Sequence, residues 1–107
     1  MNSSVDQKKQ FKRRVWDWAH KLEAPVTSVV ARPMKTKWAS CSTTGRLTFD
    51  VFLLGVQHDI QDYVIVHELL HFSIPNHGKL WKSLMRAHLG DYEIYDTKLK
   101  EFAKREL

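Results

Sequence analysis

The chain contains a single cysteine, Cys41, among its 107 residues, and this excludes an intramolecular disulfide. A lone thiol is typical of a protein from a reducing compartment. No apolar run approaches the roughly 18–20 residues that a membrane-spanning helix needs. Residues 1–7 contain no apolar signal region before the charges begin. We therefore expect a cytoplasmic protein with no membrane partner.

No internal repeat, linker or low-complexity tract divides the sequence, so we expect one domain over residues 1–107. A hydrophobic content of 43% and four tryptophans indicate a packed globule rather than disorder. The formal net charge of +5 permits weak, non-specific attraction to nucleic acid or to acidic protein. It does not require either partner, and the composition leaves the oligomeric state unspecified.

The first half of the chain predicts one helix followed by strands. Apolar residues recur at helical spacing from about residue 5 to 23, with lysines and arginines on the outer face. Val26–Ala31 is a short β-branched segment, typical of a strand. Residues 34–42 and the alternating segment Leu47–Leu53 flank a turn at Gly45, which predicts a hairpin or meander. Of these strands, Leu47–Leu53 is our candidate for a sheet edge that accepts an extended peptide.

The second half predicts helices. One begins near Asp59, with acidic side chains in the first turn, where the helix dipole favours them. Leu80–Leu89 shows helical periodicity and is followed by Gly90, a helix-ending residue. A short last helix is expected over Leu99–Leu107. The order predicts an α+β domain with an N-terminal helix, a small antiparallel or mixed sheet and C-terminal helices.

The most informative segment is the nearly all-apolar stretch Val64–Phe72, which contains two histidines and one glutamate. At about 100° per residue, His67 and His71 project about 40° apart, with Glu68 about 60° beyond His71. Burying three such groups without partners would cost about 2–7 kcal/mol each. The pattern is H-E-x-x-H, in which two histidines bind zinc and the glutamate transfers a proton.

A third histidine follows the motif closely. Pro75 cannot continue the helix, so the chain turns. His77 follows, with five residues between it and His71. An imidazole on that turn can close on the same metal, giving three protein ligands and one open position, as in catalytic zinc sites. The alternative is that His77 is a surface residue and that the third ligand lies elsewhere, with His88 or Glu93 next in order.

Other side chains are candidates for supporting roles. Asp62 is a candidate to orient a ligand histidine, although an acid near a helix N-terminus needs no such role. Tyr92 and Tyr95 are candidates to stabilise an oxyanion, and packing is the simpler explanation for both. Cys41 is either an inhibitory metal ligand or a buried, inert thiol. Two tryptophans, Trp38 and Trp81, are expected to pack beneath the site, and the alternative for both is a role in the substrate pocket.

Three segments together resemble the YgjP-like metal-dependent hydrolases. These are M-K-T-K-W-A-S-C-S from Met34, H-E-L-L-H from His67 and N-H-G-K-L-W from Asn76. The family typically shows M-K-T-R-W-G-S-C-S, V-V-H-E-L-A-H-L and N-H-S-x-x-F-W in this order. The match covers roughly residues 28 to 95, and Ala39 replaces the family's usual glycine. The family is similar to minimal zincin peptidases and, more distantly, to SprT-like proteases that act on DNA-bound protein.

The resemblance implies a small zincin-like fold, zinc on His67, His71 and His77, and Glu68 as the catalytic base. The spacing from His67 to His77 equals that of metzincins, but Ile74 occupies the position of their glycine. We therefore expect a zinc metallopeptidase, or a related amide hydrolase, that acts on a peptide or protein substrate. The alternatives are a non-catalytic zinc-stabilised adaptor for nucleic acid or protein, and a DNA-associated SprT-like protease. Retention of Glu68 favours the enzyme, because a structural zinc site needs no base.

Overall fold

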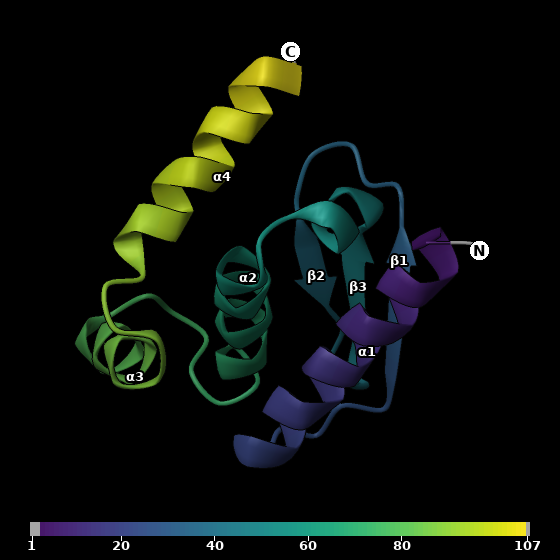
Figure 1. The fold of residues 1–107 in the computed structure, drawn as a ribbon. Coiled ribbons are helices and arrows are strands. Elements are labelled where there is room, and N and C mark those ends of the chain that lie inside the picture. The colour runs from purple at the N-terminus through teal and green to yellow at the C-terminus, as the bar shows by residue number, and fades with distance from the viewer. Residues whose placement is uncertain (1–2, 107) are drawn as a thin grey trace.

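The computed structural model describes the backbone of residues 3–106 and the side chains of residues 5–103. Within this part, helices precede and follow a small sheet (Figure 1). The elements are α1 (Ser3–Lys21), β1 (Ser28–Arg32), β2 (Ala39–Cys41), β3 (Arg46–Asp50), the 3-10 helix η1 (Val51–Gly55), α2 (His58–Leu70), α3 (Lys79–Leu89) and α4 (Glu93–Glu106). The predicted α+β class is confirmed.

The three strands form a mixed sheet in the order β1-β3-β2. β1 pairs with β3 in parallel, with Ser28 opposite Arg46, and β2 pairs with β3 antiparallel, with Ala39 opposite Phe49. The hairpin predicted around Gly45 is therefore confirmed. Its turn requires glycine, because Gly45 has a φ of +94° and a side chain there would collide with the carbonyl of Pro25.

Two predictions about the strand after this turn are wrong. The strand ends at Asp50 instead of continuing to Leu53, because the Asp50 carboxylate accepts a hydrogen bond from the Phe52 N–H and starts η1. Leu53 is still buried, but it is in the 3-10 helix. In addition, β3 is the central strand and has a neighbour on each side, so it cannot accept a peptide. The open edge near the metal-ligand candidates belongs to β2.

The hydrophobic core lies between the sheet and the first two helices. α1 packs against β1 and η1, and α2 packs against α1 and β2. α3 and α4 contact α2, on the side away from α1 (Figure 1). The largest side chains that are essentially inaccessible are Phe11, Phe49, Leu47, Leu53, Ile60, Ile65, Met85, Val15 and Val66. α2 therefore forms the centre of the domain and is held by neighbours on several sides.

The helices differ from the predictions mainly at their ends. The last helix begins at Glu93 rather than near Leu99, because Tyr92, Tyr95, Leu99 and Phe102 continue one apolar stripe that packs on the core. Leu107, the predicted end of that helix, lies outside the described residues. Among the described helices, none combines the length and the apolar composition that crossing a membrane requires.

Candidate metal centre

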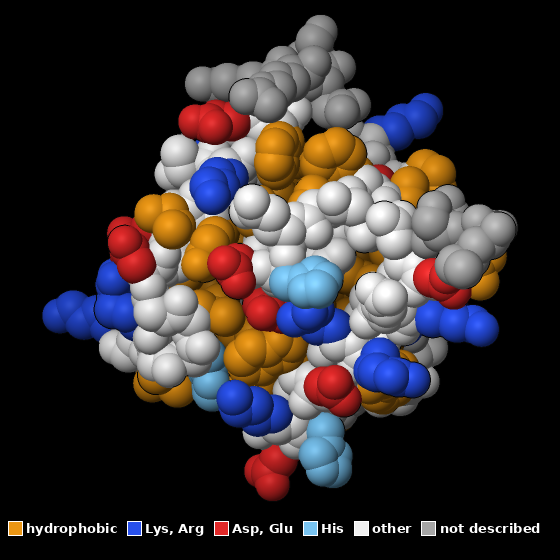
Figure 2. Space-filling model, in the orientation of Figure 1, with side chains coloured by type: hydrophobic (Ala, Val, Ile, Leu, Met, Phe, Trp, Pro, Cys, Tyr) orange, Lys and Arg blue, Asp and Glu red, His pale blue; other side chains and the backbone are white. Residues whose placement is uncertain are grey.

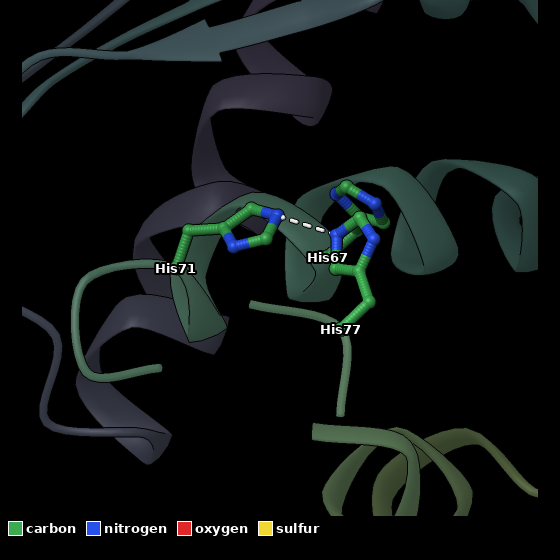
Figure 3. Close-up of side chains that lie close together, drawn as sticks. All are labelled: His67, His71 and His77. Atoms are coloured by element: carbon green, nitrogen blue, oxygen red, sulfur yellow. Dashed lines mark hydrogen bonds between the residues drawn. The ribbon is translucent and has the colours of Figure 1, made fainter. Parts of the chain in front are cut away.

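The three histidines predicted as metal ligands lie together at the C-terminal end of α2. His67 is in the last turn of α2, His71 is the first residue after that helix, and His77 is on the turn before α3 (Figure 3). The centroids of their rings are 4.8, 4.9 and 5.0 Å apart. One ring nitrogen from each histidine lies within 4.8 Å of the others. The fold thus brings all three imidazoles to one point.

The spacing of these nitrogens suits a small tetrahedral cation. Zinc–nitrogen bonds of about 2.0–2.1 Å at the tetrahedral angle place two ligand nitrogens about 3.3 Å apart. The Nε2 atoms of His71 and His77 are 3.0 Å apart, and a ring nitrogen of His67 lies within 4.8 Å of the ligand nitrogens of both. Among the described residues, no fourth protein donor joins the group. The donor set therefore fits a metal with one open position.

The turn after α2 sets the orientation of two of the rings. The Nδ1 atom of His71 is 3.2 Å from the carbonyl oxygen of Ile74, so Nδ1–H can donate a hydrogen bond to this oxygen and leave Nε2 free to bind a metal. α2 ends at Leu70, Pro75 prevents the chain from resuming the helix, and the Asn76 side chain accepts a hydrogen bond from the N–H of Gly78 at 3.1 Å. This side-chain turn directs His77 back toward α2.

Trp81 of α3 supports all three imidazoles from behind. Its ring centroid is 4.4 Å from that of His77, 5.1 Å from His67 and 6.0 Å from His71. The Trp81 side chain is buried, and its Nε1–H has no hydrogen-bond partner in the described part of the chain. The prediction that this tryptophan packs beneath the site is therefore confirmed.

Glu68 lies beside this group, on the wall of a cavity. Its Oε1 atom is 3.7 Å from Nδ1 of His67, and its side chain is 13% exposed. The cavity has a volume of about 350 Å³ and lies between α2, the segment 36–39 that leads into β2, and α4. Its lining includes Trp38, Ala39, Val64, His67 and Glu68. A carboxylate in this position can accept a proton from a molecule that occupies the cavity.

The protonation of His77 also suits a metal ligand. Burial lowers the pKa of His77, and the neighbouring His67 and His71 lower it further. A neutral imidazole is the form that binds a metal, so the cluster favours the binding form before any ion arrives.

Of the two explanations offered for Asp62, its contacts exclude the one in which it orients a ligand histidine. Its Oδ1 atom accepts hydrogen bonds from Arg14 and from the indole N–H of Trp18, each at 2.9 Å. These partners belong to α1, on the other side of α2. At about 100° per residue, Asp62 lies about 140° around the helix from His67, so it cannot reach the same face.

Sequence reasoning missed Tyr63, which does share a face with His67. The two rings are 5.9 Å apart, and the Tyr63 hydroxyl donates to Oδ1 of Asp96 at 3.0 Å. Burial, together with the charge and hydrogen bond of Asp96, raises the pKa of Tyr63, so the hydroxyl keeps its proton. The i,i+4 spacing of Tyr63 and His67 was the available signal.

The remaining candidates lie outside the cluster of three histidines. Tyr92 is buried against Trp81, and the ring of Tyr95 is 6.5 Å from that of Tyr63. His88 packs edge-on to Trp18, and Glu93 pairs with Arg86 at 2.7 Å, so neither belongs to the group. Cys41 is half-buried at the end of β2; burial and the charge of Glu68 raise its pKa, and its sulfur is not among the clustered donors.

Comparison with known proteins gives a consistent result. The family model for the YgjP-like metallopeptidase domain matches residues 4–102. The solved structure of the metallopeptidase zymogen jannalysin from Methanocaldococcus jannaschii superposes with a TM-score of 0.71, at 28% identity over 88% of this chain and 95% of that chain. The metallopeptidase zymogen abylysin from Pyrococcus abyssi gives a TM-score of 0.69, at 19% identity over 94% of this chain and 95% of that chain. A comparison with curated proteins gave no match.

Proposed function

The chain belongs to the YgjP-like metallopeptidase family and is a metal-dependent peptidase, and from this we propose that it hydrolyses peptide bonds with a zinc ion held by His67, His71 and His77. One observation carries the proposal. Three imidazoles from α2 and the following turn converge at one point, and one of them, His67, lines together with Glu68 a cavity that is large enough for a substrate side chain. When bound, the metal supplies a Lewis acid that acidifies water and polarises a carbonyl.

The proposed roles of the protein groups follow from their positions. Glu68 accepts a proton within the cavity and returns it to the departing amine. His71 is held by the Ile74 carbonyl, so its ligating nitrogen faces the other two rings. Trp81 excludes water from the rear of the cluster, because it is buried against all three rings.

An extended substrate is proposed to pair with the open edge of β2. In the described sheet this strand has β3 as its neighbour on one side only. Ala39 of β2 lines the same cavity as His67 and Glu68, so a peptide added at this edge passes the catalytic group. Main-chain pairing of this kind gives affinity without demanding a particular sequence.

The test compares the wild-type protein with Glu68→Gln. Zinc content should be the same in both, because the substitution leaves the three imidazoles unchanged. Cleavage of an unstructured protein such as casein should fall by about 10²–10⁴-fold, the usual contribution of a positioned base. Equal turnover by the two zinc-loaded proteins would refute the role of Glu68.

The alternative, a non-catalytic adaptor for nucleic acid, has less support. On the face that carries α1, lysine and arginine side chains are interspersed with aspartate and glutamate instead of forming one basic patch (Figure 2). Interspersed charge of both signs is typical of a solvated surface, whereas nucleic-acid binding favours a continuous basic stripe.

A further inference from the structure

A second cavity continues the catalytic cavity away from the metal centre. It has a volume of about 600 Å³ and lies between the segment Met34–Trp38, the start of η1 and the end of α4. Thr36, Lys37 and Trp38 line both cavities. The two cavities therefore form one groove, in which Trp38 separates the catalytic end from the distal end.

One face of α4 forms a wall along this groove. Asp96, Leu99 and Lys100 line the catalytic cavity, and Ala103 lines the distal one. These residues follow the i, i+3, i+4, i+7 spacing of a single helix face. Seven residues at about 1.5 Å rise each span about 10 Å, which is the length of about three residues of extended peptide. The distal end is thus about three residues from the scissile bond.

The floor of the distal end is aromatic and accessible. The rings of Trp38 and Phe52 are 5.4 Å apart, and those of Phe52 and Phe102 are 5.5 Å apart. Phe52 and its neighbour Val51 are each 37% exposed, although most large apolar side chains of the domain are buried. Exposed apolar surface of this kind, when it lines a groove, is typical of a binding site.

The rim of the distal end carries positive charge. Lys35 and Lys37 are exposed, and neither has an acidic partner within ion-pair distance among the described side chains. Of the acids that line the groove, Asp96 pairs with Lys100 at 3.0 Å, and Glu68 lies at the catalytic end. Asp50 accepts a hydrogen bond from the Phe52 N–H and is the one carboxylate in the described lining of the distal end, where Lys35 and Lys37 outnumber it. The distal end therefore carries a net positive charge.

We propose that this distal groove, formed by Lys35, Lys37, Trp38, Val51 and Phe52, is a specificity subsite for substrates with a bulky apolar residue about three residues from the scissile bond and acidic residues beside it. The inference rests on the proposed function, because it assumes that the peptide passes Glu68 along β2. The aromatic floor takes the apolar side chain, and the two lysines take the flanking carboxylates. An acidic-apolar segment is the ligand that this combination of floor and rim fits best.

The experiment uses peptides that share one cleavable centre and differ only at a distance from it. A phenylalanine or an alanine is placed two to five residues from the scissile bond, on either side, and is flanked by two aspartates or two lysines. We expect phenylalanine three residues away on one side to raise kcat/KM by about 10-fold or more. Aspartate flanks should raise it further, and lysine flanks should lower it.

The decisive variant is Lys35→Glu with Lys37→Glu. It should reverse the preference, so that peptides with lysine flanks become the better substrates, while Phe52→Ala should remove the effect of the distal phenylalanine. The matched control is Lys9→Glu with Lys98→Glu, which changes the net charge equally at exposed positions outside the groove. The control should keep the wild-type preference. An unchanged preference in the Lys35/Lys37 variant would overturn the proposal.

A binding measurement separates this inference from the catalytic proposal. Fluorescein-labelled peptide with the favoured phenylalanine and aspartates is titrated onto the zinc-loaded Glu68→Gln protein and followed by anisotropy. If the Lys35→Glu and Lys37→Glu substitutions weaken this binding by about 10-fold, the proposal about the groove is supported. This holds even if the wild-type protein cleaves nothing, and in that case only the proposed function fails. If the protein cleaves casein but shows no flank preference in peptide cleavage or in peptide binding, the proposal about the groove alone is overturned.

Discussion

Trp81 should link the stability of the domain to its affinity for metal, and Trp81→Ala tests this. Its side chain is 4% exposed and touches all three imidazoles. Removing a buried tryptophan costs about 3–5 kcal/mol, a large share of the roughly 5–15 kcal/mol that stabilises a domain of this size. At roughly 4–8 °C per kcal/mol, the Tm of the metal-free protein should fall by about 12–40 °C.

The effect on metal binding has a separate origin. Without Trp81 behind them, the three imidazoles must be ordered when the metal binds, at about 0.5–1 kcal/mol each. Affinity should therefore fall by about 10–100-fold. At a zinc concentration 100 times the wild-type Kd, zinc stabilises the wild-type protein by about 2.7 kcal/mol. In Trp81→Ala the same concentration should contribute only about 0.4–1.4 kcal/mol.

Thermal denaturation of metal-free and zinc-loaded protein measures both effects. Met85→Ala is the matched control, because Met85 is fully buried on the same helix and should cost about 2–5 kcal/mol. Its zinc-dependent stabilisation should stay at the wild-type value. Trp81→Phe should fall between the wild type and Trp81→Ala, since a smaller ring remains and the unpaired Nε1–H is removed. A full zinc-dependent increment in Trp81→Ala would refute the supporting role of this residue.

Four further predictions concern the site and its surroundings. His77→Ala should weaken zinc binding strongly, and undiminished zinc by elemental analysis would exclude it as a ligand. Asp62→Ala leaves Arg14 and the Trp18 N–H unpaired and should cost about 1–3 kcal/mol in urea unfolding, with zinc content unchanged. Burial opposes ionisation of Asp96, but hydrogen bonds from a lysine and a tyrosine leave its pKa below the ordinary value. The ionised Asp96 therefore stabilises the folded state fully above its pKa in the unfolded chain, about 3.9. This stabilisation is lost as the pH falls through the lower pKa that Asp96 has in the folded protein. Asp96→Asn should accordingly cost about 1 kcal/mol at pH 7 and progressively less as the pH falls below about 3.9, as urea titrations over this range will show. Finally, DNA binding should be weak and should disappear between low and near-physiological salt in a titration with labelled DNA; sub-micromolar binding at the higher salt would contradict this.

The cluster of three histidines was predictable because its geometry is local. Helical periodicity alone puts His67 and His71 on one face, and Pro75 forces the turn that returns His77 to that face. The same periodicity, applied more strictly, would have excluded Asp62 and found Tyr63. Nearness in sequence to the motif therefore indicates a partner of a ligand histidine only when the residue also shares its helix face.

The position of β3 could not be read from the sequence in the same way. Its alternating pattern indicates a strand, but the pairing with β1 is parallel and joins residues 18 positions apart, such as Ser28 and Arg46. Such pairing depends on the packing of the whole sheet and leaves no local signal. The end of the strand at Asp50 did have a local signal, because an aspartate followed by a capped turn competes with continued pairing.

Because of the arrangement of the helices, a bound metal would affect the structure of the domain as well as its chemistry. α3 and α4 join the rest of the domain mainly through α2, whereas α1, the sheet and α2 share the central core. The ligand candidates cross this division, because His67 and His71 belong to α2 and its end while His77 precedes α3. A metal on these three side chains would fix the turn between α2 and α3 and with it the position of Trp81. Since α4 lines the cavity beside Glu68 and follows directly after α3, we expect removal of the metal to loosen this cavity as well.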